Sequence, residues 1–112
     1  MNQGEIWLVN LDTTIGAEIR KTRPCVIVND DTVGRLPLKI VAPTTEYKDK
    51  YKDVPWMVAI APGPENGLDK KSVIDLFQVR SVAEERLVRL VGTIGRDQGL
   101  QVKEALKVVF GF

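Results

Sequence analysis

The sequence of 112 residues contains no histidine and a single cysteine, Cys25. Without histidine, zinc sites of the Cys/His type cannot form, and neither can Ser-His-Asp or Cys-His nucleophile systems. One cysteine cannot make an internal disulfide, which favours a reducing compartment. Any catalysis must therefore use arginine, lysine, tyrosine, hydroxyl or carboxylate groups, and we expect no bound metal and no cofactor.

An excess of charge of one sign is also missing, because 16 Lys and Arg residues face 15 Asp and Glu residues. Binding of a nucleic acid would thus rest on local positive charge. No apolar run is long enough to span a membrane, and Met1–Glu5 lack the features of a signal peptide. We expect a cytoplasmic protein without membrane contact, folded as one domain over residues 1–112.

What the sequence does contain is a series of strand-length apolar or β-branched runs bounded by turn residues. Several are apolar on both faces, as in Cys25-Val26-Ile27-Val28, which predicts strands covered on both sides or closed into a barrel. Cys25 itself is then a small buried hydrophobic residue. The six predicted strands are Glu5–Leu11, Arg23–Val28, Leu38–Pro43, Trp56–Ala61, Ser72–Phe77 and Leu87–Thr93.

Helical patterns are few. Ser81-Val82-Ala83-Glu84 has the spacing of a capping box and predicts a short helix that ends near Arg86. Near the C-terminus, Asp97 is a plausible N-cap for a longer helix. The apolar stripe of that helix follows the i, i+3, i+4, i+7, i+8 pattern and consists of Val102, Ala105, Leu106, Val109 and Phe110.

Two polar loops, Asp12–Thr22 and Thr44–Pro55, are long for so small a domain, and such loops often carry function. At the end of the first loop, Arg23 joins a positive cluster with Arg20 and Lys21. Arg23 precedes Pro24, which restricts the local backbone, so its guanidinium could grip two phosphate oxygens. The alternative is a surface arginine paired with Glu18 or Asp30.

In the second loop, a hydroxyl of Thr44 or Thr45 could donate to a phosphate oxygen, or could bond to nearby backbone in an ordinary turn. The segment that follows, 46–53, interleaves tyrosines such as Tyr47 with three lysines, a pattern that binds single-stranded nucleic acid by stacking and charge. Three acidic residues nearly cancel those lysines, so a solvated hairpin loop is the other interpretation.

Several stretches, in this order, resemble the MazF/PemK family, the toxins of bacterial toxin–antitoxin pairs. The resemblance runs nearly from end to end of the chain. The stretches that carry it most specifically are Gly4–Asp12, Gly16-Ala17-Glu18 and Thr22–Val28, supported by Ile40–Thr45, Ser72–Asp75 and Gln78-Val79-Arg80.

This resemblance implies a mainly β fold, a twisted antiparallel sheet curled into a small SH3-like barrel with short helices, a C-terminal helix and a homodimer. It implies sequence-specific, metal-independent cleavage of single-stranded RNA, mostly messenger RNA, that leaves a 2′,3′-cyclic phosphate and a 5′-hydroxyl. It also implies a cognate antitoxin, a segment of which would occupy the RNA groove.

By the same resemblance, Arg23 and Thr45 are the catalytic residues, and the loop Thr13–Thr22 closes over the groove. Some plasmid-borne relatives use an Asp and a His as their acid–base pair, whereas the matching positions here hold Phe77 and Ala17. The proton acceptor is left open between Glu18 and Tyr47. The residues expected to contact RNA are Glu18, Arg20, Lys21, Thr44, Tyr47 and Gln78.

Two other functions are compatible with the same scaffold. One is a non-catalytic toxin that poisons DNA gyrase, since the tail Phe110-Gly111-Phe112 loosely resembles the aromatic-Gly-hydrophobic end of such relatives. The other is an SH3-like module that binds RNA or peptide without cutting it.

Overall fold

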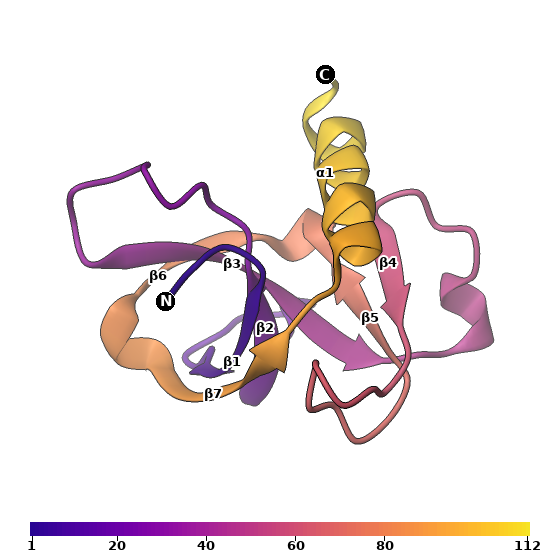
Figure 1. Cartoon of the computed structure of the whole chain (residues 1–112), viewed down its shortest axis with the longest axis horizontal. Helices are drawn as coiled ribbons and strands as arrows, with labels where there is room; N and C mark the ends of the chain where they lie inside the picture. Colours follow the sequence, from indigo (N-terminus) through magenta and orange to yellow (C-terminus); the bar gives the residue numbers. More distant parts are fainter.

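A computed structural model describes all 112 residues and has seven β-strands followed by one long α-helix (Figure 1). The strands are β1 (Glu5–Asn10), β2 (Thr22–Ile27), β3 (Leu38–Glu46), β4 (Met57–Ile60), β5 (Ser72–Asp75), β6 (Arg80–Ala83) and β7 (Leu87–Thr93). The helix is α1 (Arg96–Phe110), and three 3-10 turns are η1 (Asp49–Tyr51), η2 (Leu76–Gln78) and η3 (Glu84–Arg86). The predicted mainly β fold with a C-terminal helix is confirmed, and no helix is long and apolar enough to cross a membrane.

All strand pairs are antiparallel, in the order β4-β5-β3-β2-β1-β7, and β6 pairs additionally with β3. The sheet is not closed into a barrel, because no ladder joins β4 to β7. The loop between β4 and β5 approaches β7 instead, where the Thr93 amide donates to the Glu65 carbonyl at 2.9 Å. The expected closed barrel is therefore an open, strongly bent sheet.

The long strand β3 organises this sheet because three strands pair with it. β2 lies along its middle, while β6 pairs with its first half and β5 with its last three residues. Between β5 and β6 the chain makes the turn η2, in which the Phe77 amide is capped by the Asp75 carboxylate at 3.0 Å. The turn therefore projects residues 76–78 beside the middle of β3.

Apolar residues cover both faces of the central strands, as the sequence predicts. Successive residues of β2 belong to two different core clusters, with Val26 on the side of α1 and Cys25 and Ile27 on the other side. Val102 and Ala105 of α1 pack in the first cluster. Burial raises the pKa of Cys25 to about 12, so the side chain is a protonated thiol, and its prediction as a buried small hydrophobe is confirmed.

Three local predictions are wrong. Residues 81–83 form strand β6 rather than a helix, and only the following turn Glu84–Arg86 is helical. The N-cap of α1 is Gly95, which places Asp97 in the first turn, where its charge still complements the helix dipole. Thr44 and Thr45 do not open a loop, because β3 continues to Glu46 by pairing with β5.

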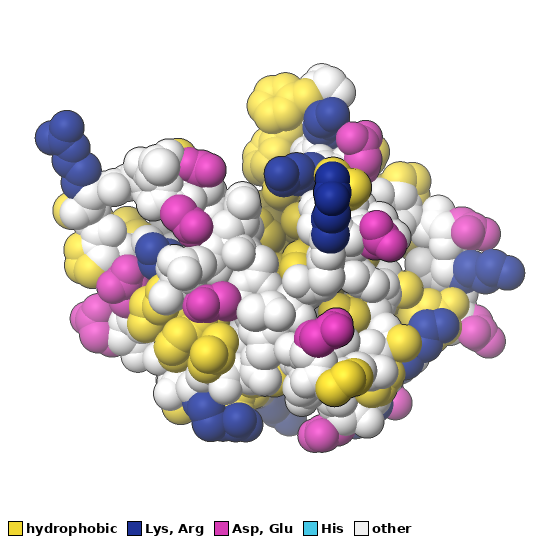
Figure 2. All heavy atoms as spheres, viewed as in Figure 1, with side chains coloured by type: hydrophobic (Ala, Val, Ile, Leu, Met, Phe, Trp, Pro, Cys, Tyr) yellow, Lys and Arg dark blue, Asp and Glu magenta, His cyan; other side chains and the backbone are white.

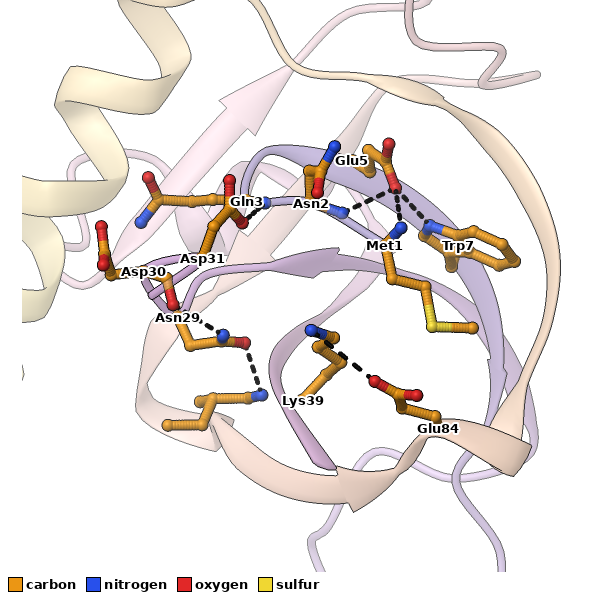
Figure 3. A network of polar contacts seen from close by, with 11 residues as sticks. Met1, Asn2, Gln3, Glu5, Trp7, Asn29, Asp30, Asp31, Lys39 and Glu84 are labelled. Carbon is orange, nitrogen blue, oxygen red and sulfur yellow. Dashed lines mark hydrogen bonds and ion pairs between the residues drawn. The ribbon is translucent and has the colours of Figure 1, made fainter. Parts of the chain in front are cut away.

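The N-terminus is fastened by polar contacts at an edge of the sheet (Figure 3). The Glu5 carboxylate accepts hydrogen bonds from the backbone amide of Asn2 and from the Trp7 indole, both at 2.9 Å. The hydrogen bond from the indole lowers the pKa of Glu5. The backbone amide of Gln3 donates to the Asp31 carboxylate at 2.7 Å, which joins the N-terminal segment to the loop between β2 and β3. These contacts fix the start of β1.

Candidate functional site

Arg23 and Thr45 lie on the neighbouring strands β2 and β3 and line the same cavity. The ladder between these strands ends at Cys25 and Pro43, and each of the two residues lies two positions beyond that end. There the buried hydroxyl of Thr44 donates to the Pro24 carbonyl at 2.7 Å and connects the two strands. The guanidinium and the hydroxyl are therefore both carried by strands of the sheet.

The Arg23 side chain is partly buried and has little of its hydrogen-bonding capacity used within the protein. Its Nε donates to the Arg20 carbonyl at 3.2 Å, which orients the group, while neither terminal nitrogen donates to a protein atom. Neither of the carboxylates considered from the sequence, Glu18 or Asp30, forms an ion pair with it. The hydroxyl of Thr45 likewise has no partner in the protein, so both groups are available to a ligand.

A cavity of about 310 Å³ contains both residues. At its rim, Lys70 and Glu46 form an exposed ion pair at 3.8 Å, a type that contributes little to stability. Two polar residues of this cavity, Asp69 and Lys70, were not predicted from the sequence. They come from the loop between β4 and β5, which carries no local motif. The polar residues that line the cavity are Arg23, Thr44, Thr45, Glu46, Asp69, Lys70 and Ser72.

A second hollow, of about 350 Å³, lies between the loop after β1 and the turn η2. The Gln78 amide joins the two segments, because its oxygen accepts from the Ile19 amide at 2.6 Å and its nitrogen donates to the Ala17 carbonyl at 3.4 Å. Glu18, Phe77 and Gln78 line this hollow with six other residues. The first loop is thus fixed against the sheet by a residue that the sequence singles out.

The two hollows are neighbours along β3. Pro43 lines the second hollow and Thr45 lines the first, and these residues are two positions apart on one strand. Residues so spaced share a face of the strand and lie about 7 Å apart. A single extended ligand could therefore occupy both hollows.

Asp75 supports the turn that carries Phe77 and Gln78. Its side chain is only 5% exposed and accepts hydrogen bonds from the Phe77 amide and from Gln78. Burial raises the pKa of Asp75, although these hydrogen bonds act in the opposite direction. Because the folded protein then binds this proton more tightly than the unfolded chain, the contribution of Asp75 to stability falls as pH rises through the raised pKa.

We therefore expect the wild type to lose stability relative to the Asp75→Asn variant as pH rises above the ordinary pKa of an aspartate, about 4, and through the raised pKa of Asp75. Asparagine keeps an oxygen that can cap Phe77 but has no charge to bury. Urea unfolding of both proteins at several pH values measures this difference. A difference between the two proteins that stays constant with pH would contradict the assignment of the buried charge to Asp75.

The remaining predicted RNA contacts are more scattered. Arg20 and Lys21 are exposed on the loop after β1, near Arg23 in the chain. Tyr47 lines neither hollow, and its ring lies 4.0 Å from the Lys71 ammonium. The Thr44 hydroxyl is engaged with Pro24, so Thr44 supports Arg23 from within the protein.

Charged groups over the rest of the molecule show no strong segregation. In Figure 2, basic and acidic side chains are interspersed on the face that is drawn, in keeping with a net charge of +1. No group of three His, Cys, Asp or Glu side chains is close enough to hold a metal ion. The unpaired guanidinium of Arg23 is therefore a local feature on a surface of mixed charge.

Comparisons with known proteins find relatives along nearly the whole chain. The Mycobacterium tuberculosis protein called Endoribonuclease MazF9 is 33% identical over 96% of this chain and 94% of its own length. Endoribonuclease MazF of Staphylococcus epidermidis is 32% identical over 99% and 92%.

Solved structures show the same fold. An endoribonuclease in complex with its cognate antitoxin from Mycobacterial species superposes with a TM-score of 0.78 at 15% identity, covering 100% of this chain and 96% of that one. The Mycobacterium tuberculosis toxin MazF-mt6 gives 0.77 at 24% identity, covering 96% and 97%. The sequence model of the PemK-like, MazF-like toxins of type II toxin–antitoxin systems matches residues 2–110, and the chain belongs to this family.

Proposed function

We propose that this toxin is a sequence-specific endoribonuclease that cuts single-stranded RNA, chiefly messenger RNA, without a metal. The observation that carries the proposal is the pair formed by Arg23 and Thr45, whose guanidinium and hydroxyl share a cavity and have unused donors. Two relatives that match nearly the whole chain are named endoribonucleases, which supports the same activity here.

In the proposed reaction, the 2′-hydroxyl oxygen of the substrate attacks the adjacent phosphorus while the bond to the 5′-oxygen breaks. The products are a 2′,3′-cyclic phosphate and a 5′-hydroxyl. Negative charge grows on the phosphate oxygens in the transition state, and donors fixed in advance stabilise it most effectively. Arg23 would supply two parallel N–H groups and Thr45 one O–H group to these oxygens.

The proton of the 2′-hydroxyl must pass to a base, and arginine is unsuited to this role because its guanidinium stays protonated. Glu46 directly follows Thr45 in the sequence and lines the same cavity, while Glu18 lines the neighbouring hollow. Tyr47, the other base considered from the sequence, lines neither hollow. We therefore assign proton removal to a carboxylate, and the departing 5′-oxygen takes up a proton from water to become the 5′-hydroxyl.

RNA contacts would extend from the cavity along the loop after β1 and the turn η2. Arg20 and Lys21 would attract the phosphates by charge, while Glu18 and Gln78 would face the bases. Residues 1–112 would act as a single toxin domain, inhibited by a cognate antitoxin and paired as a homodimer. Antitoxin binding is supported by the solved relative that is in complex with its cognate antitoxin.

The test is to incubate the purified protein with a long messenger RNA and to map the new ends. We expect cuts at one short sequence, 5′-hydroxyl ends, 2′,3′-cyclic phosphates and full activity in excess EDTA, because the 2′-hydroxyl attacks without a metal-bound water. RNA in which the 2′-hydroxyl at the cut is replaced by hydrogen should bind but resist cleavage.

Loss of activity in EDTA, with recovery on adding a divalent cation, would contradict the proposed mechanism. Binding without any cutting would favour the RNA- or peptide-binding module. Absence of RNA binding together with toxicity that depends on the last three residues would favour the gyrase poison, since Phe110 and Phe112 stack at the exposed end of α1.

A further inference from the structure

Phe77 is an aromatic residue in an unusual place, because its side chain is 71% exposed at the rim of the hollow lined by Glu18 and Gln78. Single exposed apolar side chains are common on protein surfaces, so it is the position of Phe77 at a cavity rim, next to a second aromatic residue, that distinguishes it. Phe77 contributes to neither core cluster. Its exposure therefore calls for a ligand.

The ring of Phe77 is also held in place. Its own amide donates to the Asp75 carboxylate at 3.0 Å, and the following residue, Gln78, is fastened to the loop after β1. Trp56 meets the ring edge-on, with centroids 6.2 Å apart and planes at 62°. The Trp56 carbonyl accepts from the Leu76 amide at 3.0 Å, so the two aromatic residues are joined through their backbones as well.

An edge-on neighbour supports an aromatic ring while leaving its face free. Flat nucleobases stack on such faces, and single-stranded RNA is recognised in this way when its bases are unstacked from one another. The Glu18 carboxylate and the Arg80 guanidinium line the same hollow. The first accepts from the Ile15 amide and the second donates to the Leu11 carbonyl, so their remaining oxygen and N–H groups could meet the hydrogen-bonding edge of a base. Their charges of opposite sign suit a base better than a phosphate.

We propose that Phe77, supported by Trp56, is a stacking platform for one unpaired base of the RNA, adjacent to the cut made at Arg23 and Thr45. The inference rests on the proposed ribonuclease function and adds to it a subsite for a base. Its position follows from β3, which places Pro43 of this hollow two residues from Thr45 of the cavity. A strand bound at the cavity would thus bring a neighbouring nucleotide to Phe77.

The test uses a short RNA that contains the mapped cut sequence, in a cleavable form and in a form with a 2′-deoxy nucleotide at the cut. Phe77→Ala should raise KM, and Kd for the uncleavable RNA, by about 5- to 150-fold, the range found when a base-stacking aromatic residue is removed. The effect on kcat should be small, because stacking acts on the bound ground state and transition state alike. Phe77→Tyr should restore both constants.

Phe110→Ala is the matched control, because Phe110 is 57% exposed but lies on α1 and lines neither hollow. It should leave KM unchanged. A scan with an abasic nucleotide at each position then locates the stacked base. At one position the abasic RNA should weaken binding to the wild type as much as Phe77→Ala does, and should weaken binding to Phe77→Ala no further.

Unchanged KM and Kd in Phe77→Ala would overturn the inference. So would an abasic scan in which, at every position, the loss of RNA binding caused by the missing base adds fully to the loss caused by Phe77→Ala. A variant that cuts RNA normally but binds its antitoxin more weakly would show that the aromatic pair is a protein contact instead. The proposed function fails separately, if the wild type cuts no RNA at all. If Phe77→Ala has the KM and Kd of the wild type while Arg23→Ala is inactive, the stacking proposal is wrong but the ribonuclease proposal is retained.

Discussion

Arg23→Ala should lower kcat for RNA cleavage by about two to three orders of magnitude or more, the loss found when one preorganised donor to a developing oxyanion is removed. The guanidinium has two terminal nitrogens without a protein partner, so it can address two phosphate oxygens at once. Cleavage of a defined RNA under single-turnover conditions measures the loss. Arg23→Lys should recover little of it, because an ammonium cannot present two parallel donors.

The control is Arg35→Ala, which removes an exposed arginine from the loop between β2 and β3 and away from both hollows. This variant should cut RNA at the rate of the wild type. Arg23→Ala should keep the melting temperature of the wild type within a few degrees, because its side chain makes one hydrogen bond and no ion pair. An active Arg23→Ala protein would remove the main support for the mechanism.

Gly92→Ala should lower the stability of the fold strongly. A Cβ at this position of β7 would lie 2.4 Å from the Glu65 carbonyl oxygen and 2.5 Å from the Asn66 carbonyl carbon. Both are backbone atoms, which cannot move aside as a flexible side chain can. We expect a loss of about 1–3 kcal/mol or more in the free energy of unfolding, and a fall in Tm of roughly 5–20 °C.

Gly99→Ala is the matched control for Gly92→Ala, because Gly99 lies inside α1 and a Cβ there would meet nothing within 4 Å. It should raise stability by about 1 kcal/mol, since glycine is a poor residue for a helix interior. Thermal unfolding followed by circular dichroism compares the two. Equal stabilities for Gly92→Ala and the wild type would mean that the loop between β4 and β5 does not press on β7.

The strands that depend on local composition could be predicted from the sequence, whereas those that depend on distant partners could not. The sequences of β1 and β2 are rich in apolar and β-branched residues, and this composition predicts the ends of both strands to within one or two residues. β6 was missed because Ser81 and Glu84 have the spacing of a helix cap, and only pairing with β3 makes the segment extended. Local propensity yields to such non-local pairing.

The same limit applies to the ends of elements. Thr44 and Thr45 follow a proline and precede polar residues, which is typical of a loop, yet Ile74 and Val73 pair with them and extend β3. The C-terminal helix begins at Arg96 with Gly95 as its N-cap, although Asp97 is the better capping residue by type. Tertiary contacts decide such boundaries, and a single sequence does not contain them explicitly.

For the candidate site, the sequence indicated the residues at the ends of the strands but not those brought in from elsewhere. Arg23 stands out because it precedes a proline at the start of a strand, and the structure places it in the same cavity as Thr45. Lys70 reaches the cavity lined by Glu46 only because the loop after β4 folds back beside β3. No spacing rule links these two positions.

The residues proposed to cleave RNA lie on strands, whereas those proposed to recognise its bases lie on a loop and a turn. This separation has a consequence for how such toxins could change their RNA specificity. The groups assigned to bond breaking sit on strands, where Arg23 pairs with Val9 of β1 and Thr45 pairs with Val73 of β5. The groups assigned to base recognition sit on the segment after β1 and on η2, which are joined to each other chiefly through Gln78. Exchanging those two segments together with a relative's should redirect which RNA sequence is cut while leaving the rate of bond cleavage nearly intact.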